Sequence, residues 1–172
     1  MDPTFVLLII VATVLLSATV GLMISMILKV KKGVLCSRIW ICLTTVLSML
    51  LVALSWVLNF GWIRFFLTLL LFPLIHGIAF LVSNIVFSKY ANRSHKMVKL
   101  NLLYIASYLI SYIFMPDGGD IGGLYFFFGL IHNDVLSYIA AFISYLAFIG
   151  QILFFVLQID KIRMIKKNDL RN

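Results

Sequence analysis

Glutamate is absent from this 172-residue chain, and charged residues of all kinds make up only 12% of it. Soluble domains carry about 25% charged residues, because water must solvate their surfaces. Hydrophobic residues reach 63% of the chain, whereas soluble domains contain roughly 45–50%. The low charged fraction and the high hydrophobic fraction exclude an ordinary soluble domain and indicate a chain whose apolar residues face lipid.

Cysteine is scarce, and the two cysteines present, Cys36 and Cys42, do not form a Cys-x-x-Cys pair. A thiol-redox enzyme is therefore disfavoured. Both lie in a part of the chain that we place at the cytoplasmic face, where the reducing environment makes a disulfide unexpected. The sequence contains no Gly-x-Ser-x-Gly motif of the hydrolase type. It also has no cofactor fingerprint, so we assign neither a cofactor nor a catalytic residue.

Long apolar runs fill most of the chain, and short hydrophilic stretches between them hold 13 of the 14 Lys and Arg residues. About 20 apolar residues cross a membrane as a helix, and a backbone in lipid must satisfy its own hydrogen bonds. The runs are continuous rather than alternating, which excludes a barrel. The predicted fold is all-α, a polytopic transmembrane helix bundle in one integral membrane domain. Its five predicted spans cover residues 4–28, 39–58, 65–87, 100–115 and 135–157.

The distribution of charge predicts the orientation, since Lys and Arg accumulate in cytoplasmic loops. With the basic stretches inside, the outside holds one Arg, Arg64, and four of the six Asp residues. This predicts the N-terminus outside and the C-terminus inside, with a basic cytoplasmic tail at residues 160–172. The basic residues are expected to contact anionic lipid head groups rather than nucleic acid. The composition is typical of a multi-pass protein of the bacterial cytoplasmic membrane.

Four polar residues stand out within the predicted spans: His76, Asn84, Tyr108 and Gln151. Such side chains are costly in lipid, so they are expected to point inward. They would either line a shared polar cavity for a small solute or only hold the helices together through hydrogen bonds. Pro73 precedes His76 and is predicted to kink the third span.

Two spans carry small or polar residues at regular spacing. Thr13, Ser17, Gly21 and Ser25 follow one another at four-residue steps and predict a ridge that allows close helix packing. The ridge would contact either another helix of this chain, or a membrane-protein partner or second copy. In the last span a seam at seven-residue steps is predicted to face the bundle; it consists of Ser137, Ser144, Gln151 and Gln158.

Residues 116–134 form the long outward loop, and its aromatic segment at residues 124–131 is too short to cross a membrane. We predict an interfacial or re-entrant segment, with residues 125–128 anchored in the aromatic belt. The loop also offers four candidate ligands for a divalent cation, namely Asp117, Asp120, His132 and Asp134. Their spacing matches no metal motif, and acidic outward loops also follow from the charge bias. The metal therefore stays unknown.

Three hypotheses for function remain open. The leading one is a non-enzymatic accessory or immunity-type protein that binds a partner in the membrane, because the chain offers a small-residue ridge and no convincing catalytic set. The second is a component that binds or transports a small solute in a polar intramembrane cavity. The third is an intramembrane or interfacial enzyme acting on lipid, which would use His76 or the loop group of Asp117, Asp120, His132 and Asp134. A dyad of His76 with Ser83 or Ser107 can be drawn, although nothing in the spacing demands it.

Overall fold

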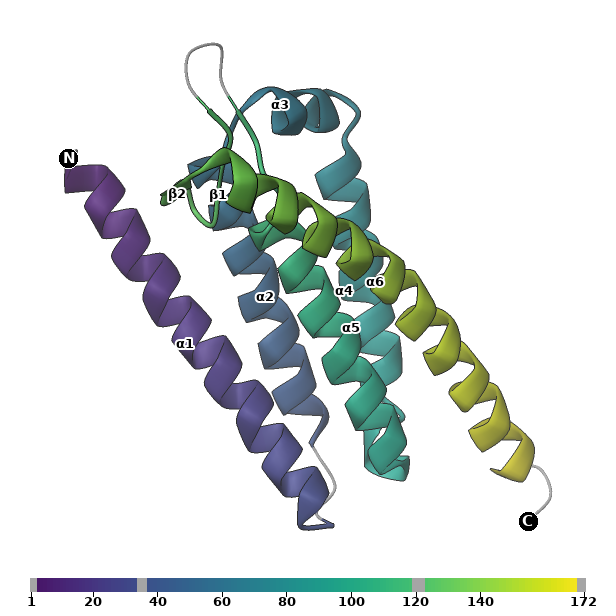
Figure 1. Cartoon of the computed structure of the whole chain (residues 1–172). Helices are drawn as coiled ribbons and strands as arrows, with labels where there is room; N and C mark the ends of the chain where they lie inside the picture. Colours follow the sequence, from purple (N-terminus) through teal and green to yellow (C-terminus); the bar gives the residue numbers. More distant parts are fainter. Residues whose placement is uncertain (1–2, 34–36, 119–122, 170–172) are drawn as a thin grey trace.

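The computed structural model describes residues 3–33, 37–118 and 123–169, which form an all-α bundle with one short hairpin (Figure 1). Its helices and strands, in chain order, are α1 (Pro3–Lys31), α2 (Arg38–Leu58), α3 (Trp62–Leu69), α4 (Phe72–Ser88), a 3-10 turn (Ala91–Arg93), α5 (His95–Ile113), β1 (Tyr125–Phe126), β2 (Ile131–His132) and α6 (Asp134–Asp169). The all-α prediction is confirmed.

Within the described residues, three helices are long and apolar enough to cross a membrane, namely α1, α2 and α6. The bent pair α3 and α4 makes a fourth candidate if it counts as one span. The fourth predicted span corresponds to α5, which is more polar because it carries Asn101, Tyr104 and Tyr108. These side chains are buried inside the bundle, so neighbouring helices cover them.

The third predicted span, at residues 65–87, is not one continuous helix. The structure breaks it between α3 and α4, whose axes differ by 71°. Leu71 at the break has a left-handed backbone with φ of 53°, and Pro73 occupies the first turn of α4. Proline suits that position because its missing N–H has no helical partner there. The predicted kink is therefore a full interruption, and α3 lies across the end of the bundle (Figure 1).

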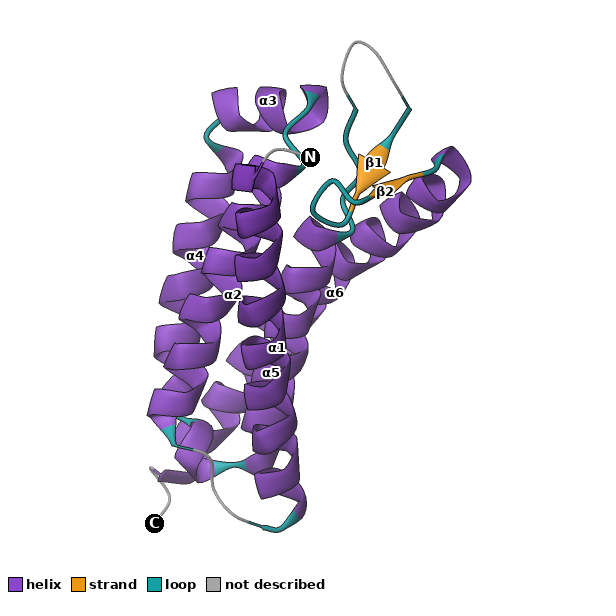
Figure 2. Ribbon diagram, turned by 90° about the vertical axis from the view of Figure 1, so that its left-hand side faces the viewer, coloured by secondary structure: helices purple, strands orange, loops and turns teal. Residues whose placement is uncertain are grey.

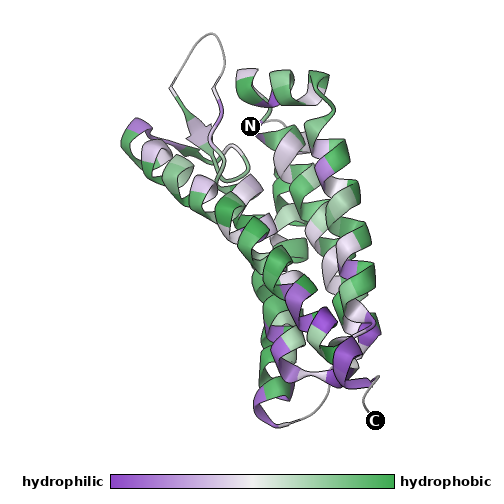
Figure 3. Cartoon of the chain, turned by 90° about the vertical axis from the view of Figure 1, so that its right-hand side faces the viewer, coloured by the Kyte–Doolittle hydropathy of each residue, from purple (hydrophilic) through white to green (hydrophobic). Residues whose placement is uncertain are grey.

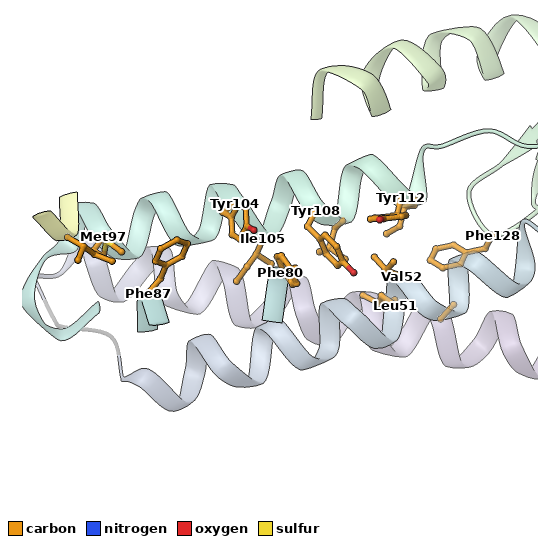
Figure 4. Packing of buried hydrophobic residues seen from close by; sticks show 14 residues of the cluster. Leu51, Val52, Phe80, Phe87, Met97, Tyr104, Ile105, Tyr108, Tyr112 and Phe128 are labelled. Carbon is orange, nitrogen blue, oxygen red and sulfur yellow. The ribbon is translucent and has the colours of Figure 1, made fainter. Parts of the chain in front are cut away.

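The core is organised around α5, which α6, α2, α4 and α1 all contact. Tyr104, Tyr108 and Tyr112 lie along α5 (Figure 4), and Phe80 of α4 stacks on Tyr108 with ring centroids 3.7 Å apart. The predicted α6 seam is confirmed, since all four of its residues are buried against the bundle. Aromatic and polar side chains thus share this core.

The two ends of the bundle differ in charge. The described Lys and Arg residues other than Arg64 lie around the end of α1, the beginning of α2, the region between α4 and α5, and the end of α6. Figure 3 shows hydrophilic residues gathered there. We call this the basic end and the opposite one the α3 end. The basic tail continues α6 as a helix to Asp169.

At the α3 end, α6 is inclined away from α2 and α4, and the β1–β2 hairpin lies beside it (Figure 2). The hairpin is antiparallel, with Tyr125 opposite His132 and Phe126 opposite Ile131. Its turn places Phe127, Phe128 and Gly129 at positive φ. Phe126 and Phe128 are buried, so the belt-anchor role predicted for them is wrong: they pack within the protein.

Candidate functional site

Arg64 is a fully buried charged group at the α3 end, with 0% of its side chain exposed. Its guanidinium donates to the carbonyl oxygens of Tyr112 at 3.0 Å and Met115 at 2.9 Å, and also to that of Ser55. Ser55 and Tyr112 lie in the last turns of α2 and α5, where the Ser55 carbonyl also accepts from the N–H of Asn59 and the Tyr112 carbonyl from the Ser55 hydroxyl. The positive charge also suits the negative ends of the two helix dipoles. Arg64 therefore caps two helices at once.

Asp117 caps the N-terminus of α3. Its carboxylate accepts hydrogen bonds from the backbone N–H groups of Gly61 at 3.1 Å, Ile63 at 3.0 Å and Arg64 at 2.9 Å. These donors belong to the first turn of α3, which no side chain of its own caps. Asp117 also forms a buried ion pair with Arg64, with Oδ2 3.9 Å from Nε. One carboxylate and one guanidinium thus join α2, α3 and α5.

The hairpin is attached to this cluster through its first strand. Asp117 and Tyr125 exchange two backbone hydrogen bonds of 2.9 and 2.8 Å, and the Tyr125 hydroxyl donates to the carbonyl of Phe60 at 2.9 Å. Partial burial raises the pKa of the Tyr125 phenol, and the nearby Asp117 carboxylate acts in the same direction. The hairpin is therefore fastened to the connection between α2 and α3.

Sequence reasoning missed Arg64 as a functional residue and counted it only as an outward charge. A signal was present: Arg64 is the single charged residue between Arg38 and Lys89. A lone charge in a long apolar stretch needs a buried partner or a wet surface. The partner, however, lies 53 residues further along the chain, and nothing in the local pattern identifies it.

The four loop candidates do not form a metal centre in the part of the chain that the structure describes, where no three His, Cys or Asp residues are grouped. Asp117 is occupied by backbone N–H groups. Asp134 accepts from the N–H of Leu124 at 3.1 Å. His132 bonds the carbonyl of Gly129 through Nε2 at 2.9 Å. Asp120 lies outside the described residues.

The four intramembrane candidates fall into two layers. In the first layer His76 Nδ1 lies 2.6 Å from the Tyr112 hydroxyl, and His76 and Gln151 line the same groove. Tyr108 joins this layer, with its ring centroid 5.5 Å from that of His76. The structure therefore brings His76, Tyr108 and Gln151 together, as the cavity and cohesion hypotheses both require.

Asn84 belongs to a second layer, nearer the basic end. Its Oδ1 accepts from Asn101 Nδ2 at 2.7 Å, and its Nδ2 donates to the carbonyl of Phe80 at 2.8 Å. Asn101 Nδ2 also lies 3.5 Å from Gln158 Oε1. All three amides are buried, so this layer joins α4, α5 and α6 from within.

The His–Ser pairs of the enzyme hypothesis are not formed. The Ser83 hydroxyl donates to the carbonyl of Ala79 at 2.6 Å, while His76 is paired with Tyr112. Ser107 lies against Gly150 of α6. A hydroxyl that already donates to a backbone carbonyl is not poised as a nucleophile for His76.

The small-residue ridge lies on the outer face of α1. Thr13, Ser17 and Gly21 are exposed, Ser25 is half-buried, and a Cβ added at Gly21 would meet nothing within 4 Å. The packing of α1 onto α2 and α5 instead involves Ala12, Thr19, Met26 and Val30. At 100° per residue, these face the opposite side of the helix from the ridge. Packing within this chain therefore does not use the ridge.

Comparison with known protein families, curated proteins and solved structures finds no match to this chain.

Proposed function

We propose that the protein crosses the membrane five times, through α1, α2, the α3–α4 pair, α5 and α6, with the N-terminus outside and the C-terminus inside. The positive charges at the basic end support this orientation, because Lys and Arg favour the cytoplasmic side. The burial of polar residues of α5 supports its placement as a central span. The bacterial cytoplasmic membrane is the proposed location.

Cysteine labelling tests this topology. In a chain with Cys36 and Cys42 replaced by Ser, Leu130→Cys places a thiol in the hairpin and Met164→Cys places one near the end of α6; both original side chains are exposed. We expect a membrane-impermeant maleimide to label Leu130→Cys in intact cells and Met164→Cys only after permeabilisation. The reverse pattern would invert the proposed orientation, and labelling of both in intact cells would end the five-span proposal.

The proposed function is non-enzymatic: the protein binds a partner in the membrane, as an accessory subunit or an immunity-type protective protein does. The observation that carries this proposal is the outward position of the ridge at Thr13, Ser17, Gly21 and Ser25. Small residues in lipid favour helix association because they let two backbones approach closely. Since α1 uses its other face for its own bundle, the ridge is free to receive a helix from another polypeptide.

Native mass spectrometry of the protein, extracted gently from its own membrane, tests this function. We expect a second polypeptide at fixed stoichiometry, and we expect Gly21→Leu with Ser25→Leu to remove it by filling the ridge. Val20→Phe with Ile27→Phe is the matched control, because it adds bulk at exposed positions that lie about 100° or more around the helix from Gly21 and Ser25. Loss of the partner in both double variants, or in neither, would contradict docking at the ridge.

A further inference from the structure

A groove of about 220 Å³ lies between α4 and α6, with α5 behind it. Residues of α4 and α6 line its two sides and one tyrosine of α5 completes it: His76, Ala79, Ser83, Gln151, Ile152, Phe155 and Tyr104. Tyr104 occupies the middle of α5 (Figure 4), so the groove lies between the two ends of the bundle. None of these seven lining residues is charged. A molecule bound here must therefore be neutral and able to enter the membrane interior.

The polar side chains of the groove differ in their hydrogen bonds. His76 Nδ1 pairs with the Tyr112 hydroxyl at a distance of 2.6 Å. Gln151 Nε2, in contrast, has no partner among the described residues.

The Ser83 hydroxyl of the groove is also used, because it donates to the carbonyl of Ala79. The Gln151 amide is different, because its side chain is only 3% exposed and its nitrogen remains unpaired within the described chain. A buried donor without an acceptor is unfavourable, and more so in lipid than beside water. The groove thus lacks one hydrogen-bond acceptor.

We propose that this groove binds a neutral, lipid-soluble carbonyl compound of the quinone class. A quinone oxygen would accept from Gln151 Nε2 and supply the missing partner. Its flat ring suits the aromatic surroundings, since Tyr104 and Phe155 have ring centroids 6.2 Å apart and His76 lies 5.5 Å from Tyr108. Ile152 is 68% exposed, so the groove opens toward the lipid, where an apolar tail would extend. This site is independent of the ridge on α1.

Photolabelling of the full-length protein in lipid nanodiscs with a short-chain azidoquinone tests the proposal. We expect the label within residues 76–83 or 151–155, and we expect the same quinone without the azide to compete for it. Gln151→Leu should weaken competition about tenfold, the value of one hydrogen bond to a buried donor. Ile152→Trp should abolish site labelling by filling the groove from its open side.

Two matched variants separate binding from partitioning into lipid. Gln158→Leu removes a buried amide one heptad away on the same helix, in the Asn84 layer, and Leu153→Trp adds the same bulk at an exposed position outside the groove. Both should label as the unaltered protein does. If Gln151→Leu fails to fold, the two Trp variants decide the question. Equal labelling of Ile152→Trp and Leu153→Trp would overturn the proposal. A label outside the groove, or stronger competition by a polyprenol than by the quinone, would overturn it as well.

Discussion

Replacement of Arg64 with methionine is expected to destabilise the folded bundle by about 3–5 kcal/mol, the usual effect of removing one partner of a buried ion pair. Asp117 would keep its charge in a site from which water is excluded. The carbonyls of Ser55, Tyr112 and Met115 would each lose the guanidinium as a donor at the same time. These losses fall on the ends of α2 and α5, so we expect the whole α3 end to loosen.

Unfolding in detergent, followed by the loss of tertiary signal with rising denaturant, measures this effect. Arg163→Met is the control: Arg163 is 77% exposed and paired only with Asp160, so its loss should cost less than about 1 kcal/mol. The stability of Arg64→Lys should lie between those of Arg64→Met and Arg163→Met. An ammonium keeps the charge but lacks the planar guanidinium that donates to several carbonyls at once. Equal stability of Arg64→Met and Arg163→Met would refute the double-capping role of Arg64.

The positions of the helices were largely predictable from the sequence. A backbone in lipid has no water to bond, so a long apolar run of sufficient length must be a helix, and α2 at Arg38–Leu58 agrees closely with the predicted 39–58. The interruption between α3 and α4 was less predictable. Pro73 marked the region, but the break required Leu71 to adopt positive φ, which nothing in the local sequence indicates.

The candidate polar residues were predicted individually, but their pairing was not. A seven-residue period places Gln151 and Gln158 on one face of α6, and both are buried there. Which side chain contacts each amide depends on how far α4, α5 and α6 are shifted along their axes relative to one another. Helical periodicity fixes the angle of a residue around its own axis and leaves this offset between helices undetermined. Asn84 therefore lies with Asn101 and Gln158 rather than with His76.

Gly61→Ala is expected to destabilise the α3 end by about 1–3 kcal/mol, as overpacking of a tight site does. A Cβ at this position would lie 2.6 Å from Asp117 Oδ1 and 2.6 Å from the carbonyl oxygen of Gly118. The backbone oxygen cannot move aside as a flexible side chain does, so the carboxylate or α3 must shift. We therefore expect the hydrogen bonds that Ile63 N–H and Arg64 N–H donate to Asp117 to weaken.

Amide hydrogen exchange measures the weakening of these hydrogen bonds, and the unfolding experiment described for Arg64→Met measures the loss of stability. In Gly61→Ala, the amides of Ile63 and Arg64 should exchange faster than in the unaltered protein, since their acceptor has moved. Gly21→Ala is the matched control, because a Cβ there meets nothing within 4 Å and alanine favours a helix by about 0.5–1 kcal/mol over glycine. It should leave the α3 end unchanged and cause no loss of stability. If Gly61→Ala behaved in the same way, the close contact between Asp117 and the start of α3 would not exist.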